Sequence, residues 1–568
     1  MLVPLKPIYG QSPLTTVKSI ALRPGQVRMD SEKLSTLYTM LCAAGKNHPA
    51  AWEPAFRMAC LLNAKPCEEP AYGWISAFAD TQREDGSFDV SVTDAVHGVC
   101  AMMAVYAHRP DRALLEKMMR FCAWLGANWQ DVIAAREIRV AAADLMALVC
   151  ELYRITGKKG LIRLCEQLRQ HSMDWASVMH TFSVQRPMKR MVRVSEMEDG
   201  MEEEQHHEAG FYTRQYLTCH GETLADGARA ALCSSVYSGN GQEATAAKAG
   251  WEKISRWHGA VCGGVTSDET LGGLSASCAV DAAALGAWAE AFVQQLQLDD
   301  AAQIADALER IVYNGMPAAV EGDKLIPYQR VNGLRVQCGT RDCFTVHEGD
   351  EQAMRALCRL ARGWNAAAHG AVCSTVKGAD VHLYLPGTYA LRMDDKPVRM
   401  TVSGENGEYR ITLNMKQDID GEIRLRTPAW TDDAFIAVND EGGHEGKKDA
   451  YLALERKWHD GDVIRISFAR KAEVTEGYHQ SVSVRYGETV MVCPVTEEAW
   501  AYAVTGQPEE REGRVFVTVK SVAQWRCANG VPGDMPVLPA VTGEAFEIEM
   551  KPYAQTACRL SALPKAAK

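Results

Sequence analysis

The chain has 568 residues, of which 47% are hydrophobic and 23% charged, and a formal net charge of −11 at pH 7. A chain of this length is too long to fold around a single hydrophobic core, so we expect two or three domains, with enough volume for a deep pocket. The acidic balance argues against a nucleic-acid or anionic-membrane partner, because either would require a cationic face.

The first residues contain no long apolar run, and no later segment offers about twenty uninterrupted apolar residues. We therefore expect a cytoplasmic protein without a membrane partner. The 18 cysteines are scattered through Ala- and Leu-rich stretches and form no Cys-x-x-Cys pair. This pattern is typical of reduced thiols that serve as small core side chains, and not of disulfides or a zinc ribbon.

Residues 31–372 are a succession of Ala-, Leu- and Met-rich segments with apolar residues at helical spacing, separated by Gly, Pro or Asp turns. Stretches 141–168 and 285–313 show the recurring unit, which is a helix, a tight polar turn and a second helix. Hairpins repeated at roughly fifty-residue intervals predict an α/α toroid, because each hairpin must bury its apolar face against its neighbours.

From about residue 373 the apolar pattern changes to period two with short turns, as at 409–414 and 463–468. This predicts one or two β-sandwich domains. The expected organisation is an N-terminal extension (1–30) that packs on the β region, a helical barrel (31–372) and the sandwich region (373–568). The last holds no compact cluster of acids, histidines or cysteines, so we assign it a supporting role.

A barrel of helix pairs opens its pocket where the connecting loops and the starts of the inner helices converge. Asp94 and His97 lie one turn apart at such a predicted start, and Cys219-His220-Gly-Glu222 repeats the arrangement before the helix at 224–232. Histidine offers directional donors and acceptors to the vicinal hydroxyls of a sugar. We therefore take Asp94, His97 and His220 as candidate substrate-binding residues.

The most informative stretch is 264–278, where Asp268 and Glu269 stand in a glycine-containing loop, followed by Cys278 and an Ala-rich helix. Adjacent carboxylates beside a pocket can supply a general acid when desolvation raises the pKa of one of them. The same Ser-Asp-Glu pattern is also typical of a helix N-terminal cap. The local sequence leaves both interpretations open.

A resemblance spread along the chain favours the first interpretation. Stretch 264–278 resembles the Gly-x-x-Ser-Gly-Asp-Glu…Glu-x-Cys-Ala segment of the β-L-arabinofuranosidase family, glycoside hydrolase family 127 (GH127). Further stretches resemble that family's motifs in order and at similar spacing: LERIVYNG at 308–315, IPYQRVN at 326–332, LRTPAW at 425–430, AVN at 437–439, WHDGDVIRI at 458–466 and VRYGETVMV at 484–492.

The resemblance implies an (α/α)6 barrel in which Glu269 is the acid/base, a histidine near His220 contacts sugar hydroxyls, and Tyr328 and Gln329 lie on a pocket strand. It also implies a retaining hydrolysis in which a zinc-bound cysteine thiolate attacks the anomeric carbon. In the family one glutamate and three cysteines hold the zinc, and two of these cysteines form an adjacent Cys-Cys pair. Zinc keeps such a thiol deprotonated near neutral pH.

This sequence departs from that pattern. Cys278 matches the first metal cysteine, but Ala276 stands in place of the glutamate, and the chain has no Cys-Cys pair. Before the predicted helix at 352–364, where the pair is expected, the sequence reads Cys343-Phe-Thr-Val-His347-Glu348-Gly-Asp350. The nucleophile position falls on His347 or Glu348, or on Cys343 if the loop slips. The zinc site is therefore not inherited as it stands, and no cofactor is assigned.

Three interpretations follow. We favour a glycosidase in which Glu269, beside Asp268, is the acid/base and Glu348 or Asp350 is the nucleophile or the base toward water, since two carboxylates suffice for glycoside hydrolysis. In the second, Cys278, Cys343, His347 and Glu348 rebuild a mixed zinc site. In the third, catalysis is lost and the barrel binds a carbohydrate or a partner protein.

Helical toroids also carry lyases and sugar epimerases, for which His97, His220 or Tyr328 could serve as the base. For substrate binding we take forward His97, Asp94, His220, Tyr328, Gln329 and His347. The expected substrate is a small oligosaccharide or glycoside. A homodimer through the sandwich region stays open.

Overall fold

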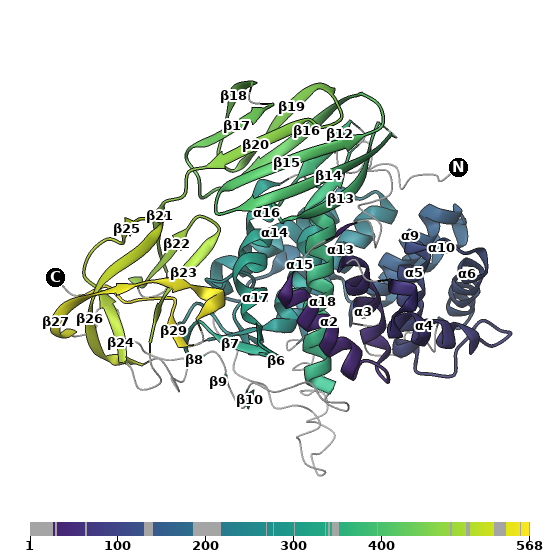
Figure 1. The fold of residues 1–568 in the computed structure, drawn as a ribbon. Coiled ribbons are helices and arrows are strands. Elements are labelled where there is room, and N and C mark those ends of the chain that lie inside the picture. Colours follow the sequence, from purple (N-terminus) through teal and green to yellow (C-terminus); the bar gives the residue numbers. More distant parts are fainter. Residues whose placement is uncertain are drawn as a thin grey trace, which may run out of the picture.

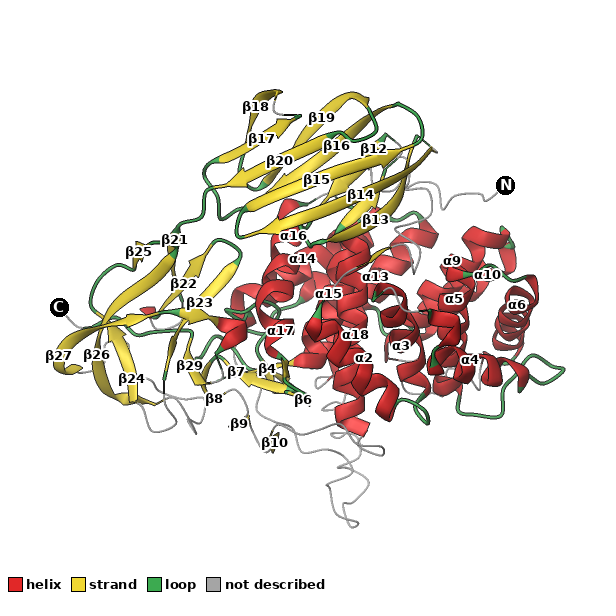
Figure 2. Ribbon diagram, viewed as in Figure 1, coloured by secondary structure: helices red, strands yellow, loops and turns green. Residues whose placement is uncertain are grey.

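The computed structural model describes residues 27–28, 31–62, 65–129, 140–185, 217–268, 270–276, 278–299, 301–334, 337–338, 341–342, 351–375, 377–394, 396–439, 441–477, 480–495, 500–526, 541–556 and 558–566. A helical region comes first and two β regions follow, one packed over the barrel and one beside it (Figures 1 and 2). Within these ranges, none of the helices has the length and apolar character needed to cross a membrane.

Six helices of the described chain contact one another in a closed ring and form the inner wall of a barrel. They are α3 (Pro49–Leu61), α5 (Val92–His108), α9 (Ala143–Thr156), α13 (Gly221–Ser238), α15 (Ala282–Leu296) and α18 (Glu351–Gly370). A second helix precedes each inner helix along the chain and packs outside the ring. These outer helices are α2 (Glu32–Ala44), α4 (Pro70–Asp80), α6 (Arg112–Ala127), α10 (Lys159–His171), α14 (Gly241–His258) and α16 (Ala302–Arg310). The predicted (α/α)6 barrel is confirmed.

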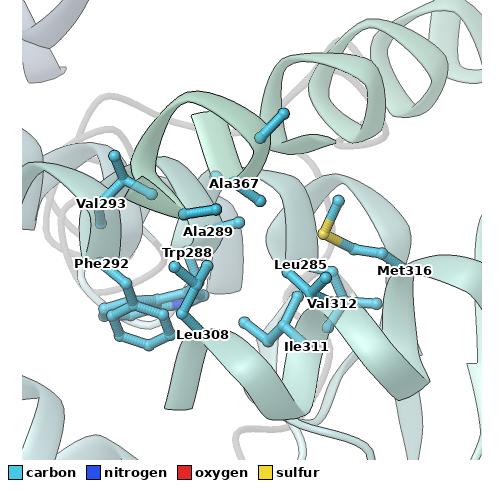
Figure 3. Packing of buried hydrophobic residues seen from close by; sticks show 14 of the residues in the cluster. Leu285, Trp288, Ala289, Phe292, Val293, Leu308, Ile311, Val312, Met316 and Ala367 are labelled. Atoms are coloured by element: carbon cyan, nitrogen blue, oxygen red, sulfur yellow. The ribbon is translucent and has the colours of Figure 1, made fainter. Parts of the chain in front are cut away.

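The inner helices α15 and α18 approach each other most closely, and two glycines allow it. A Cβ on Gly286 would lie 2.1 Å from the carbonyl oxygen of Arg359, and one on Gly363 would lie 2.6 Å from Cα of Gly286. Away from these glycines, α15 carries large apolar side chains. Trp288 and Phe292 pack against each other there, with 5.6 Å between their ring centroids (Figure 3). The backbones of α15 and α18 therefore lie directly against each other at Gly286 and Gly363.

The first β region contains a seven-stranded sheet and a four-stranded sheet, in which burial alternates along strands such as β15. The larger sheet has the order β1 (Val27–Arg28), β13 (Gly387–Met393), β14 (Lys396–Glu405), β15 (Glu408–Met415), β20 (Val463–Phe468), β17 (Ala434–Val438) and β18 (Glu441–Gly446). The smaller has the order β11 (Val372–Ser374), β12 (Gly378–Val381), β16 (Ile419–Thr427) and β19 (Ala450–Trp458). Of the predicted N-terminal extension, only Val27–Arg28 is described, and it pairs with β13.

The second β region also has two sheets, and one of them takes up a strand from the barrel domain. Its first sheet has the order β21 (Ala472–Glu476), β22 (Val482–Tyr486), β23 (Thr489–Pro494), β29 (Cys558–Leu560) and β8 (Asn332–Leu334), with β28 (Lys551–Pro552) beside β23. Its second sheet consists of β24 (Trp500–Val504), β25 (Glu509–Arg511), β26 (Arg514–Arg526) and β27 (Val541–Glu549). The amide of Asn332 fixes β8 there, since its Oδ1 accepts hydrogen bonds from the backbone N–H groups of Ser561 and Ala562 at 2.8 and 3.0 Å.

A buried group of charges joins the barrel to both β regions. Arg426, at the end of β16, is fully buried and forms ion pairs with Asp306 and Glu309 of α16. Glu309 also accepts hydrogen bonds from Trp430 Nε1 at 2.9 Å and from Arg485 Nη2 of β22 at 3.2 Å. The motifs at 308–315, 425–430 and 484–492 thus meet at one junction, which explains why they occur together in one chain.

The junction generates a stability prediction. Replacing Arg426 with Met leaves two buried carboxylates without their main partner, so we expect the free energy of unfolding to fall by about 3–5 kcal/mol. Urea unfolding followed by tryptophan fluorescence measures it. The matched control is Lys448→Met, which removes an exposed ion pair with Asp432 and should change stability by less than about 1 kcal/mol. Equal effects of the two substitutions would contradict the assigned role.

Candidate active site at the mouth of the barrel

The open end of the barrel lies where the inner helices begin. The exposed fraction of the arginine side chains on α18 falls along the helix, from 49% for Arg355 to 17% for Arg359 and 12% for Arg362. The N-terminal end of α18 therefore faces solvent and its middle lies inside the barrel. Since each inner helix follows an outer helix that runs the opposite way, the starts of all the inner helices gather at this mouth.

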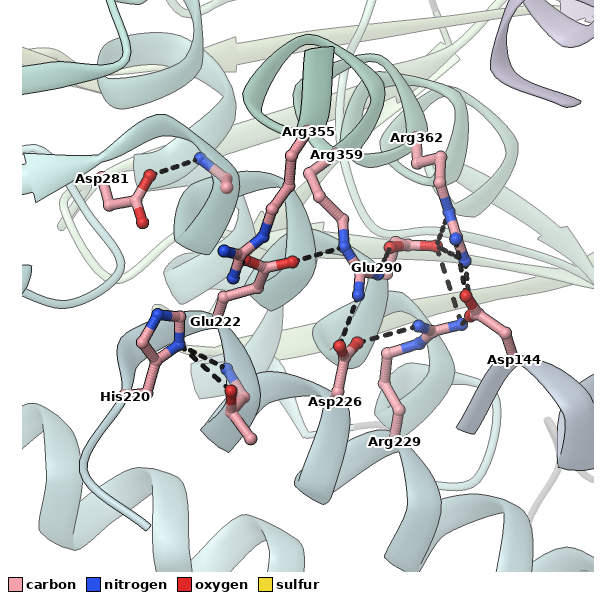
Figure 4. A network of polar contacts seen from close by, with 12 residues as sticks. Asp144, His220, Glu222, Asp226, Arg229, Asp281, Glu290, Arg355, Arg359 and Arg362 are labelled. Atoms are coloured by element: carbon pink, nitrogen blue, oxygen red, sulfur yellow. Dashed lines mark hydrogen bonds and ion pairs between the residues drawn. The ribbon is translucent and has the colours of Figure 1, made fainter. Parts of the chain in front are cut away.

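A network of ion pairs occupies the barrel directly below the mouth (Figure 4). Arg355 and Arg359 both bind Glu222 of α13, Arg359 through Nε and Glu222 Oε1 at 2.7 Å. Arg359 also pairs with Asp226, one turn further along α13, and lies 3.5 Å from Glu290 of α15. In this part of the network α18 supplies the cations, and α13 and α15 supply the anions.

The deeper part of the network involves α9 as well. Arg362 contacts Asp144 of α9 at 2.5 Å and Glu290 at 2.9 Å. Arg229 of α13 contacts Asp144 at 2.8 Å and Asp226 at 3.2 Å. Four arginines therefore face four carboxylates, and the network has no net formal charge. Charges this far from water are stable only when paired in this way.

The positive charges of the network lower the pKa of Glu222 and Asp144, whereas burial raises the pKa of Asp226. Burial by itself would raise the pKa of Glu222, but the positive charges of Arg355 and Arg359 outweigh it and lower the pKa to about 2. Burial is likewise outweighed at Asp144, where Arg362 and Arg229 hold the pKa well below its ordinary value. Both groups are therefore carboxylates throughout the physiological range.

His220 lies at the mouth and starts α13. Its Nδ1 accepts a hydrogen bond from the backbone N–H of Thr223 at 3.3 Å, so the ring caps the helix. Its backbone forms an antiparallel bridge with Thr270. The loop packs tightly here, because a Cβ on Gly221 would lie 2.6 Å from Oγ of Ser267. The predicted acid-bearing loop and the predicted sugar-binding histidine are thus brought together.

Asp268, the first residue of the acid pair, ends the short strand β2 (Ser267–Asp268), which pairs with β3 (Thr270–Leu271). Ser267 and Thr270 are buried. Glu269 lies outside the described residues, and of Asp268 only the backbone is described. The alternative in which this stretch caps the following helix is wrong, because Asp281 caps α15 by accepting the backbone N–H of Ala283 at 2.8 Å.

Cys278 precedes β4 (Ala279–Asp281) and is buried. Its thiol donates a hydrogen bond to the carbonyl of Gly272 at 2.9 Å. Among the described residues no group of three or more His, Cys, Asp or Glu side chains is placed to hold a metal ion. With Ala276 in place of the family's glutamate, the described part of the chain does not fit a four-ligand zinc site. Cys343 lies outside that part.

The predicted pocket strand is β7 (Tyr328–Arg330), which pairs with β4 and brings Tyr328 opposite Asp281. Tyr328 packs against Ala279 near the start of α15. Gln329 points the other way, as alternation along a strand requires. It is fully buried, donates to the carbonyl of Gly315 at 2.9 Å and accepts from Arg559 at 3.4 Å. The structure therefore gives Gln329 a place in the interface with the second β region.

Asp94 and His97 occupy the first turns of α5. Asp94 forms a capping box with Ser91, whose Oγ donates to Asp94 Oδ2 at 2.8 Å and accepts from the Asp94 backbone N–H at 3.1 Å. Burial lowers the pKa of His97, and the charges of Asp144 and Arg362 also act on it. No described residue hydrogen-bonds to its Nδ1. His97 thus belongs with the ion-pair network, whereas Asp94 serves the helix start.

The sequence did not single out the arginines of α18 as functional residues. The candidates predicted in the loop before α18 have no described position. Glu348, His347 and Cys343 lie outside the described residues. The signal for Arg355, Arg359 and Arg362 is their spacing of four and three, which places them on one face of a helix. Their partner Asp144 is 218 residues away from Arg362 in the sequence, so the pairing itself leaves no local trace.

Comparison with family models matches residues 378–470 to the GH127 middle domain of β-L-arabinofuranosidases. A solved structure described as a glycoside hydrolase is 14% identical, with a TM-score of 0.71, covering 99% of this chain and 100% of its own. A GH127 β-L-arabinofuranosidase from Geobacillus stearothermophilus T6 is 15% identical, with a TM-score of 0.66 and 94% of each chain covered. Another GH127 β-arabinofuranosidase is 13% identical, with a TM-score of 0.66 and coverage of 96% and 97%.

No curated protein sequence matches the chain. Residues 378–470 carry the GH127 middle domain, and the chain has the GH127 fold over nearly its whole length. The resemblance to the β-L-arabinofuranosidase family inferred from the sequence motifs is thereby confirmed.

The lowered pKa of Glu222 predicts how stability depends on pH. A carboxyl group with a pKa of 4.5 when unfolded and about 2 when folded stabilises the protein fully above pH 4.5 and loses this contribution as the pH falls toward 2. We expect Glu222→Gln to be less stable than the wild type at pH 7, with a difference that shrinks below pH 4.5. Urea midpoints at a series of pH values measure this, with the exposed Glu116→Gln as control. A difference that stays constant over that range would contradict the ion pairing.

Proposed function

We propose that the protein is a glycoside hydrolase that acts on a small oligosaccharide or glycoside at the mouth of the barrel. The observation that carries the proposal is the GH127 fold, shared over at least 94% of this chain and of each of the three solved structures. Two of those proteins are described as β-arabinofuranosidases, and we expect a terminal pentose or a sugar of similar size to bind above the ion-pair network.

In the proposed mechanism Glu269 is the general acid/base. The backbone on either side of it belongs to β2 and β3, and Thr270 of β3 bridges His220 at the mouth. As the acid, Glu269 protonates the departing glycosidic oxygen while the bond to the anomeric carbon breaks. Asp268, its neighbour, adds negative charge that raises the proton affinity of the acid.

A second carboxylate completes the chemistry of hydrolysis. We assign this role to Glu348, with Asp350 as the alternative, since both precede α18, whose start lies at the mouth. The second carboxylate either attacks the anomeric carbon or takes a proton from the attacking water. The separation between the two carboxyl groups decides between retention and inversion.

His220 and Tyr328 are the proposed contacts to the sugar, because the structure brings both to the residues that start α13 and α15. His347, which precedes α18, is kept as a third contact. His97 faces the network below, where it contributes to the floor of the pocket. Asp94 and Gln329 are not retained, because the helix start and the interface already engage their polar groups.

The acid role of Glu269 is testable with a panel of aryl glycosides. Glu269→Gln keeps the shape of the side chain and removes its proton transfer, which contributes about 10²–10⁴-fold to such rates. We expect release of the aryl group to fall by that factor, while Glu116→Gln on α6 keeps the wild-type rate. Unchanged turnover of Glu269→Gln would refute the assignment.

Whether the protein binds zinc is tested separately. In the two-carboxylate mechanism the purified protein carries no stoichiometric zinc, and a chelator leaves turnover unchanged. Metal analysis by plasma mass spectrometry measures the first and the aryl glycoside assay the second. One zinc per chain, lost on substituting Cys278 by Ala, would instead support a rebuilt site with Cys343, His347 and Glu348.

If none of the aryl glycosides is cleaved, two other functions have to be distinguished. An unsaturated product that absorbs in the ultraviolet would indicate a lyase that uses His220 or Tyr328 as its base. Sugar binding without any product would indicate a carbohydrate-binding homologue that has lost catalysis. The substitution of Ala276 for the family's metal glutamate is the observation that favours the latter over an intact zinc enzyme.

A further inference from the structure

We infer that the mouth recognises a sugar that carries an anionic group, a carboxylate or a phosphate, and that Arg355 is the residue that binds it. The hydrolysis of such a glycoside rests on the proposed function, whereas the binding of the acidic sugar does not.

Arg355 differs from the other arginines of the barrel in its exposure. Its side chain is 49% exposed, against 17% for Arg359, 12% for Arg362 and 7% for Arg229. It contacts Glu222 through Nη2, and no other described residue hydrogen-bonds to its guanidinium. The side chain of Arg355 is thus the most exposed of the four arginines, at the end of the barrel where substrate is proposed to enter.

The guanidinium of Arg355 is held in position from behind. Glu222, its partner, is buried and is fixed on its other oxygen by Arg359 Nε at 2.7 Å. Arg359 in turn contacts Asp226 and lies beside Glu290. Figure 4 shows Arg355 at the edge of this network, between Glu222 and Asp281. A cation anchored by a buried carboxylate loses little conformational entropy when it binds a ligand.

Among the described residues, Arg355 has the fewest carboxylate partners of the four arginines. Asp144, Asp226 and Glu290 each contact two or more of the deeper arginines. Arg355 shares its single carboxylate with Arg359. Asp281 also acts on Arg355 through its charge, but one of its carboxylate oxygens is used to cap α15.

The chemistry of the ligand follows from the guanidinium and its surroundings. Its planar set of donors matches the two oxygens of a carboxylate or phosphate, and a neutral hydroxyl offers no such match. The starts of α13 and α15 add the positive ends of two helix dipoles at the same place. Hydrogen bonds to charged groups contribute about 1.5–3 kcal/mol, which corresponds to a preference of about ten- to hundredfold for the acidic sugar.

Isothermal calorimetry on the full chain tests this with matched sugar pairs. The pairs are D-galacturonate with D-galactose, D-glucuronate with D-glucose, and each hexose 6-phosphate with its hexose. We expect the acidic member of at least one pair to bind at least tenfold more tightly than its neutral partner. Comparison of the uronate pairs with the phosphate pairs shows whether the anion is a carboxylate or a phosphate. No preference in any pair would overturn the inference.

The variants assign the effect to Arg355. Arg355→Gln should abolish the preference while Glu222 keeps its contact with Arg359, and Arg112→Gln on the exposed face of α6 should leave it unchanged. Arg355→Lys keeps the positive charge but lacks the planar set of donors, so it should retain a reduced preference for the acidic sugar. This variant gives a second test if Arg355→Gln does not fold. A preference that survives in both variants would overturn the inference.

Turnover separates this inference from the proposed function. Cleavage of neutral aryl glycosides with no binding of acidic sugars would refute the role of Arg355 and leave the hydrolase intact. Binding of an acidic sugar that depends on Arg355, without cleavage of any aryl glycoside or glycuronide, would refute the hydrolase and leave the binding site intact. Cleavage of an aryl glycuronide that falls in both Glu269→Gln and Arg355→Gln supports both.

Discussion

The neutral network of arginines and carboxylates inside the barrel is the constraint on which the rest of the structure depends. Three arginines on one face of α18 are buried to increasing depth, and charges at that depth require partners. The partners come from α9, α13 and α15, so the pairing fixes the arrangement of four of the six inner helices. It also occupies the barrel below the mouth (Figure 4).

The two β regions are joined to the barrel domain through buried polar contacts. The Asp306, Glu309 and Arg426 group holds α16 to the first region, and Arg485 extends it to the second. From α16 the chain continues to β7, where Gln329 and the neighbouring Asn332 are held by residues 559–562. The strand that carries Tyr328 is thereby positioned from outside the barrel.

Much of the fold could be predicted from the sequence, because helical and strand periodicity reports burial directly. The motifs behind the family resemblance contain residues that join the domains. Glu309, Arg426 and Asn332 come from these motifs and form contacts between the barrel and the β regions. Local patterns do not separate two functions that share one signature. Asp94 hydrogen-bonds to Ser91 at the start of α5, and Gln329 faces away from Tyr328 although the two are adjacent. The α18 network could not be predicted, since its pairs join residues far apart in sequence.

The most direct test is a crystal structure of the protein with an acidic monosaccharide bound. We expect the sugar at the start of α13 and α18, with its anionic group on Arg355, its hydroxyls near His220 and Tyr328, and the side chain of Glu269 directed toward the anomeric oxygen. A sugar found on the β regions, or Glu269 directed into solvent away from any bound sugar, would contradict it.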